Sequence, residues 1–186
     1  MKSMLTLVAA LIAALGLAVC AGAAPLRVAS DGAQIQRENP AMPTRVAPEN
    51  GTKILMHFGD TGIPGVLNDG GTAQALVKML PYKVRVSRYS HDFCGIMDDP
   101  LPYKEEDVHH GWLNGDIDFA TDANYFTILF EDEENSEQYG YQVNIGVITC
   151  ELSQIAAPEG RYAVLLELAE TPARLERVQS QNGTPP

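Results

Sequence analysis

The stretch from Asn114 to Phe130, NGDIDFATDANYFTILF, decides the fold. Ile117 and Phe119 alternate with Asp116 and Asp118, which is the period of a strand with one buried and one exposed face. The turn residues DAN follow, and then a second run, YFTILF, that is rich in aromatic and β-branched residues. This order of strand, short turn and strand predicts a β-hairpin, with both aspartates on its solvent face.

Strand signals also dominate the rest of the central region. Five further segments are short, apolar and bounded by turn residues: 53–58, 62–67, 83–87, 143–150 and 161–168. One helical pattern interrupts them, because apolar residues recur at i, i+3, i+4 and i+7 from Ala73 to Leu80. Thr72 is a candidate cap for this helix, and Pro81 ends it. About seven short strands with one or two short helices indicate a mainly-β sandwich or barrel.

The chain divides into four parts. Residues 52–170 form the predicted barrel domain. Residues 24–51 contain four prolines and no sustained period, which is typical of a flexible linker or arm. The tail 171–186 has a similar composition and is predicted to be disordered.

The first 23 residues are predicted to be a signal peptide. Lys2 precedes an almost wholly apolar run from Met4 to Val19, and small residues allow cleavage after Ala23. The apolar run is shorter than the roughly 20 residues of a spanning helix. The chain is therefore expected to be exported, to the periplasm or the medium. An alternative is a lipoprotein anchored through Cys20, although Val19 stands where a lipobox has Gly, Ala or Ser.

Charge limits the possible partners. The formal net charge of −11 excludes a nucleic-acid partner, which requires a basic surface, and it disfavours adsorption to an anionic membrane. Lipidation at Cys20 is the one route by which the sequence predicts membrane contact. The expected partner is a small molecule or a peptide segment, and the sequence leaves the oligomeric state open.

Two cysteines remain after signal cleavage, Cys94 and Cys150. A disulfide between them is possible in an oxidising compartment and would contribute about 4 kcal/mol by chain entropy. Two buried thiols are the alternative that the sequence favours slightly, because neither cysteine has a spacing that requires the bridge.

The stretch HHGW, which begins at His109, does not predict a metal site. Neighbouring side chains of an extended chain leave on opposite faces, so His109 and His110 do not reach one ion without a sharp bend. The acidic run Glu131–Glu134 with Glu137 lacks the EF-hand loop pattern and is predicted to be a solvated loop. No metal and no cofactor are expected.

Motifs for nucleophilic catalysis are also missing. The sequence has no G-x-S-x-G elbow, no phosphate-binding loop and no dinucleotide fingerprint. Cys94 lies near His91, but no third group in the sequence is positioned to orient the pair. No catalytic residue is therefore predicted.

Four stretches, in this order, resemble the bacterial cyclophilin-like domain family: GGTAQALVKMLPYKVRV, HDFCGIMDDPLPY, GWLNGDIDFATDANYFTILF and SEQYGYQVNIGVI. The resemblance covers about Thr52 to Leu168. It implies a small closed β-barrel with a short helix over one opening. True cyclophilins carry an arginine within Phe-His-Arg and a Gln-Gly-Gly-Asp-Phe segment, and this chain has neither.

The combined interpretation is an exported, non-catalytic binding module with a site for a small ligand or a peptide. The alternative is a peptidyl-prolyl isomerase or folding helper of the cell envelope. The candidate ligand-binding residues are polar or aromatic members of the family-like motifs: Asp92, Phe93, Tyr103, Trp112, Tyr125 and Glu137.

Overall fold

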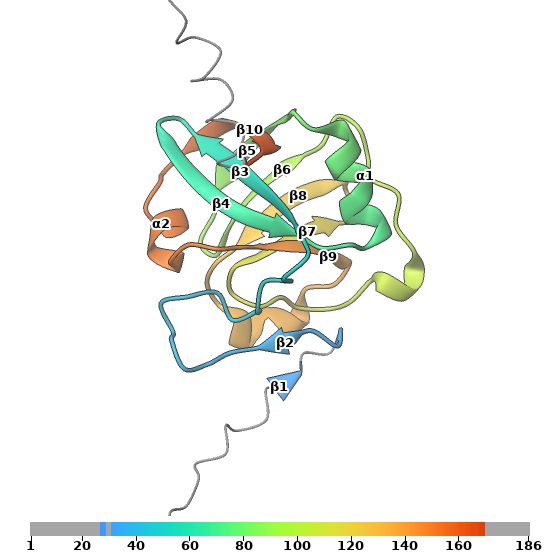
Figure 1. The fold of residues 1–186 in the computed structure, drawn as a ribbon, viewed down its shortest axis with the longest axis vertical. Helices are drawn as coiled ribbons and strands as arrows, with labels where there is room; N and C mark the ends of the chain where they lie inside the picture. Colours follow the sequence, from blue (N-terminus) through green and yellow to red (C-terminus); the bar gives the residue numbers. More distant parts are fainter. Residues whose placement is uncertain (1–26, 29–30, 170–186) are drawn as a thin grey trace, which may run out of the picture.

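Eight antiparallel strands close into a barrel in the computed structural model, which describes residues 27–28 and 31–169 (Figure 1). The hydrogen-bonded order around the barrel is β10-β3-β4-β9-β7-β8-β6-β5, and pairing of β10 with β5 closes it. The strand bounds are β3 Thr52–Phe58, β4 Thr61–Leu67, β5 Tyr82–Arg88, β6 Asp92–Ile96, β7 Asp116–Ala120, β8 Tyr125–Leu129, β9 Gln142–Ile148 and β10 Arg161–Leu168. The predicted mainly-β barrel is confirmed.

The hairpin predicted from the sequence is formed by β7 and β8, with Ala120 opposite Tyr125 and Ile117 opposite Ile128. One barrel strand, β6, has no counterpart among the predicted strands. A Cβ at Gly95 in β6 would lie 1.8 Å from the carbonyl oxygen of Arg85, so the close approach of β5 requires glycine there.

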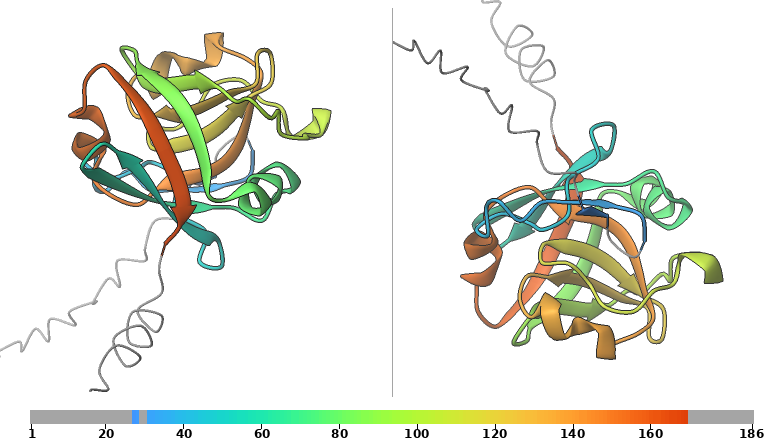
Figure 2. Two further views of the ribbon diagram at one scale, coloured as in Figure 1. Left: turned by 90° about the horizontal axis from the view of Figure 1, so that it is seen from above. Right: turned by 90° about the horizontal axis from the view of Figure 1, so that it is seen from below.

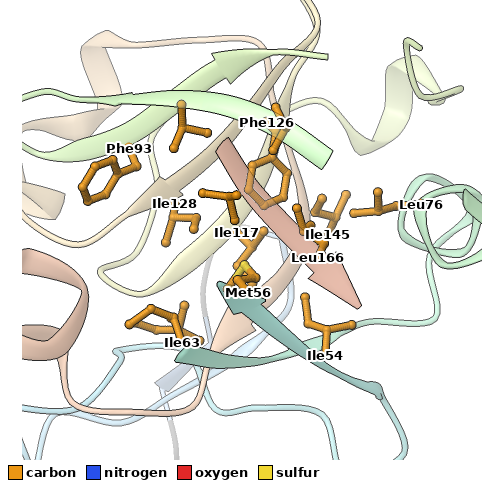
Figure 3. Packing of buried hydrophobic residues seen from close by; sticks show 14 of the residues in the cluster. Ile54, Met56, Ile63, Leu76, Phe93, Ile117, Phe126, Ile128, Ile145 and Leu166 are labelled. Atoms are coloured by element: carbon orange, nitrogen blue, oxygen red, sulfur yellow. The ribbon is translucent and has the colours of Figure 1, made fainter. Parts of the chain in front are cut away.

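Apolar side chains of all eight strands fill the barrel interior. Phe93, Phe119 and Phe126 are fully buried, and the ring centroids of Phe58 and Phe93 lie 5.0 Å apart. Figure 3 shows part of this packing, with Ile117 and Ile128 of the hairpin beside Phe126. The inward positions of β7 therefore agree with the alternation read from the sequence.

Four short helical segments connect the strands: α1 Gly71–Met79, η1 Glu105–Asp107, η2 Glu133–Gln138 and α2 Leu152–Ala156. Helix α1 packs against β9 and β4 and buries Ala73 and Leu76. Thr72 does not cap this helix as the sequence suggests. The N-cap residue is Gly70, and Thr72 lies within the first turn with its side chain buried.

The segment 31–51, called the arm below, packs along the outside of the barrel (Figures 1 and 2). It contains β2 (Gln34–Ile35), which pairs with β1 (Arg27–Val28). The sequence predicts a flexible linker over 24–51, whereas the structure buries Ile35, Thr44 and Arg45 of the arm. Hydrogen bonds, rather than a periodic apolar face, hold this proline-rich and polar segment in place.

Backbone hydrogen bonds attach the arm to the barrel connections at two places. The N–H of Thr44 donates to the carbonyl of Asn114 at 2.8 Å, and the N–H of Leu152 donates to the carbonyl of Ala41 at 2.8 Å. The predicted signal peptide, the Cys20 lipidation site and the predicted tail lie outside the described residues. No helix among the described residues is long and apolar enough to cross a membrane.

Candidate functional site

A cavity of about 940 Å³ lies between the arm and the barrel. Four segments form its walls: the arm, the turn from Asn68 into α1, the connection around η1, and β9. Seven charged or titratable residues line it, namely Asp31, Arg45, Glu49, Asp69, Glu106, Asp107 and His109. Because carboxylates predominate in this set, the walls favour positively charged groups over anions.

Arg45 attaches the arm to the barrel in the wall of this cavity. Its Nε and Nη2 atoms donate to the two carboxylate oxygens of Asp116 at 2.6 and 2.8 Å, and its Nη1 atom donates to Asp31 at 2.7 Å. Burial alone would lower the pKa of Arg45, but the hydrogen bonds and charge of Asp116 outweigh it and raise that pKa. The bidentate pair fixes the arm in one register on β7.

Asp116 and Asp118 are both fully buried, so the expectation that they face solvent is wrong. They do point away from the barrel interior, but the arm covers this outer face of β7. The alternation of the sequence correctly separates the two faces. It does not reveal that a distant segment covers the second one.

Burial raises the pKa of both carboxyls, and the effect is larger at Asp118. Asp116 is compensated by Arg45 and by the N–H of Leu113, which donates to it at 3.0 Å. Asp118 accepts one hydrogen bond, from Asn144 Nδ2 at 2.9 Å, and its second oxygen has no partner among the described residues. The protonated form is therefore favoured more strongly at Asp118 than at Asp116.

An amide relay connects Asp118 to the cavity wall. Asn144, which lines the cavity, donates to Asp118, and Asn68 Nδ2 donates to the carbonyl of Asn144 at 2.9 Å. Asn68 Oδ1 in turn accepts the N–H of Gly70 at 3.0 Å. These bonds hold the turn before α1 against β9, so the helix begins at the cavity.

Of the two adjacent histidines, only His109 lines the cavity. Its backbone pairs with Gln142, and its Nε2 atom is buried without a hydrogen-bond partner in the described part of the chain. His110 is exposed and lies beside Tyr141. Among the described residues, no three His, Cys, Asp or Glu side chains are grouped so as to hold a metal ion.

The six candidate residues from the sequence are not brought together at this cavity, and none of them lines it. Phe93 belongs to the barrel core, Tyr125 is half-buried at the start of β8, and Tyr103 is partly exposed near Phe119. Asp92 is buried, and burial raises its pKa. Its Oδ1 atom has no hydrogen-bond partner among the described residues.

Trp112 lies in an aromatic stack with His91 and Tyr139. Its ring centroid is 4.9 Å from that of His91 and 5.3 Å from that of Tyr139. The indole N–H donates to the carbonyl of Glu131 at 3.0 Å, and Glu137 is exposed in η2 beside this stack. Trp112 therefore anchors the η2 loop.

One residue of the acidic run is not solvated. Glu133 pairs with Arg37 of the arm at 3.0 Å and accepts hydrogen bonds from Thr44 Oγ1 at 2.6 Å and from the N–H of Asn114 at 2.7 Å. Its side chain is 10% exposed. The prediction of a solvated loop fails here because the arm supplies partners that are distant in sequence.

The two cysteines are free thiols, so the possible disulfide is not formed. Cys94 lies on β6 and Cys150 follows β9, and two strands, β7 and β8, separate β6 from β9 in the barrel order. Strands are about 4.8 Å apart, so this separation exceeds the Cα distance that a disulfide spans.

Cys94 is predicted to be an unreactive thiol. Burial, together with the neighbouring Asp92, raises its pKa to about 12. At pH 8 only about one thiol in 10⁴ is then ionised, and the thiolate is the reactive form. Alkylation by iodoacetamide, followed site by site with mass spectrometry, should label Cys94 far more slowly in the folded protein than in urea. Equal rates in both conditions would contradict the assignment.

The fold and the cavity define a small closed β-barrel with a hollow between its wall and an N-terminal arm. The chain belongs to the Cyclophilin-like family, whose model matches residues 56–167. This match covers β4 to β9 completely, most of β10 and the last three residues of β3. No curated protein matched the sequence.

A solved structure shares the fold. The chain is similar to the hypothetical protein AF2241 from Archaeoglobus fulgidus, known from a solution structure, with a TM-score of 0.53 and 16% sequence identity. The similarity covers 65% of this chain and 98% of that one. At this identity the likeness shows the barrel alone.

Little in the sequence points to the residues that form the cavity. Arg45 stands among prolines and polar residues, and the pairing with Asp116 spans 71 positions. One signal was available, because two carboxylates on one strand need a cation or a proton if that face is covered. The identity of the covering segment is not readable from local patterns.

Proposed function

We propose that the chain is an exported binding module of the Cyclophilin-like family that holds a small polar molecule or a peptide segment between the arm and the barrel. The single observation that carries this proposal is the cavity of about 940 Å³, formed by four separate segments. Ligand sites are typically clefts of about 300–1,000 Å³ with a few convergent polar groups. The expected compartment is the periplasm or the medium, with anchoring through Cys20 as the alternative.

Native mass spectrometry of protein purified from its own cell envelope tests the binding role. The wild type should carry an additional mass that denaturation releases. The matched variant is Gly71→Trp, because a Cβ at Gly71 meets no atom within 4 Å and the residue lines the cavity. This variant should fold normally and lack the additional mass. If the wild type and Gly71→Trp both show only the mass of the unliganded chain, the protein has no resident ligand.

The alternative function, prolyl isomerisation, finds less support in the geometry. Arg88 lies over the ring of Phe130, 4.3 Å from its centroid, and donates to the backbone carbonyls of Tyr89 and Ser90. The Nη1 and Nη2 donors of Arg88 are therefore already engaged with carbonyls of the protein itself. Arg85 is exposed on β5.

A protease-coupled isomerisation assay should therefore show no acceleration over the uncatalysed rotation, whose barrier is about 20 kcal/mol. Arg88→Lys serves as the matched variant. A fast rate in the wild type that this variant loses would establish the isomerase function and displace the binding proposal.

A further inference from the structure

We infer that the cavity selects a zwitterion with an ammonium group several bonds away from its carboxylate, with the ligand's carboxylate at the start of α1 and this distal ammonium group among the carboxylates of the opposite walls. The inference rests on the proposed binding function and names the chemical class of the ligand. Two independent observations carry it: an unpartnered polar group at the helix start, and a set of unpaired carboxylates.

The first observation concerns the start of α1. The cavity wall includes Gly70, Gly71, Thr72 and Ala73, and no side chain of the described residues caps this helix. The first N–H groups of a helix have no intrahelical acceptor, so they favour an anion or a carbonyl oxygen. Thr72 adds a hydroxyl that is buried and makes no hydrogen bond within the described chain. A buried hydroxyl without a partner is costly, and a ligand oxygen would satisfy it.

The helix start is also sterically open. A Cβ added at Gly71 has no atom within 4 Å, so space for a ligand group lies directly at the first helical residue. The side chain of Asn68 holds the preceding turn, and its Oδ1 atom accepts the N–H of Gly70. It therefore leaves the N–H groups of the first turn to other acceptors.

The second observation is the charge of the other walls. Glu49, Asp69 and Asp107 line the cavity and form no ion pair with any described residue. Arg45 does not neutralise them, because its guanidinium is already bonded to Asp116 and Asp31. A simple anion would be repelled by this field, and a simple cation would leave the helix start unsatisfied. A ligand that carries a carboxylate at one end and an ammonium group at the other satisfies both walls.

The test uses the full chain in isothermal titration calorimetry with three matched probes. L-Lysine carries a carboxylate and two ammonium groups, cadaverine lacks the carboxylate, and norleucine lacks the side-chain ammonium. Lysine should bind one to one, and each of the other two should bind about tenfold or more weakly, which corresponds to the loss of one charged hydrogen-bonded contact.

Variants assign each end of the probe. Thr72→Val should weaken lysine binding about tenfold and leave cadaverine unchanged, whereas Thr61→Val, at an exposed position of β4, should change neither. Asp69→Asn, at an exposed residue that the fold does not require, should weaken lysine and cadaverine but not norleucine. Far-UV circular dichroism confirms that each variant is folded.

Several outcomes overturn the inference. Cadaverine binding as tightly as lysine would remove the carboxylate site at α1, and norleucine binding as tightly would remove the role of the unpaired carboxylates. If Thr61→Val weakens lysine binding as much as Thr72→Val does, the carboxylate site at Thr72 is also ruled out. If no probe binds while native mass spectrometry shows a bound molecule that Gly71→Trp excludes, the zwitterion inference fails and the binding function stands. If no probe binds and no resident mass is found, both fail.

Discussion

Replacing Arg45 by methionine should destabilise the protein by about 3–5 kcal/mol at neutral pH. The substitution leaves Asp116 fully buried without the cation that now donates to both of its oxygens. Asp31 loses its partner as well. Methionine preserves the apolar stem, so the loss reports on the charge. Urea unfolding, followed by the fluorescence of Trp112, measures the change.

Two further variants show whether the loss of stability comes from the buried ion pair. Arg37→Met on the same arm breaks an ion pair whose arginine is 55% exposed, and it should cost at most about 1 kcal/mol. Asp116→Leu introduced into Arg45→Met removes the stranded carboxylate and should recover most of the lost stability. If Arg45→Met unfolds at the same urea concentration as Arg37→Met, the arm does not depend on this pair.

Asp118→Asn should change how stability depends on pH. The pKa of Asp118 is raised well above its ordinary value by burial and by the neighbouring Asp116. The folded state therefore holds a proton that the unfolded chain releases near pH 4. Stability from this proton is complete below the unfolded pKa and is lost as the pH rises through the folded pKa, at about 1.4 kcal/mol per pH unit.

The asparagine variant has no proton to lose at position 118, and it still accepts the hydrogen bond of Asn144 through its amide oxygen. Its stability should exceed that of the wild type at pH 8, and the difference should shrink as the pH falls toward 4. Unfolding in urea at several pH values measures both curves. Asp122→Asn, at an exposed residue of the β7–β8 turn, is the control and should run parallel to the wild type. Parallel curves for Asp118→Asn would show that Asp118 is ionised in the folded protein.

Periodicity and turn chemistry predicted a mainly-β sandwich or barrel, and the family resemblance chose the closed barrel. Alternation identified the inward face of β7, and the spacing from Ala73 to Leu80 located α1 to within two residues. Strand β6 was missed because Asp92–Ile96 is short, contains Gly95 and is buried on both faces over its first two residues. Such a segment has no alternation to detect.

The site was less predictable, for a physical reason. The cavity exists because residues 31–51 fold back onto the barrel beside β7, and the bonds that hold them there join positions 70 to 111 apart in sequence. Aromatic residues such as Phe93 and Trp112 drew attention in the sequence, but they stabilise the core and the η2 loop. Local patterns report on burial along one element, and the cavity wall is a product of contacts between distant elements.

The family model begins at residue 56, after the arm has ended. The matched stretch therefore contains α1 and the barrel, apart from the first four residues of β3 and the last residue of β10, but not the arm that closes the hollow from outside. A relative with the same barrel and a different upstream segment would present a differently shaped and charged chamber, so under the proposed binding function ligand preference would be modular. Swapping residues 31–51 between two such proteins is a route to exchanging their specificities without redesigning the scaffold.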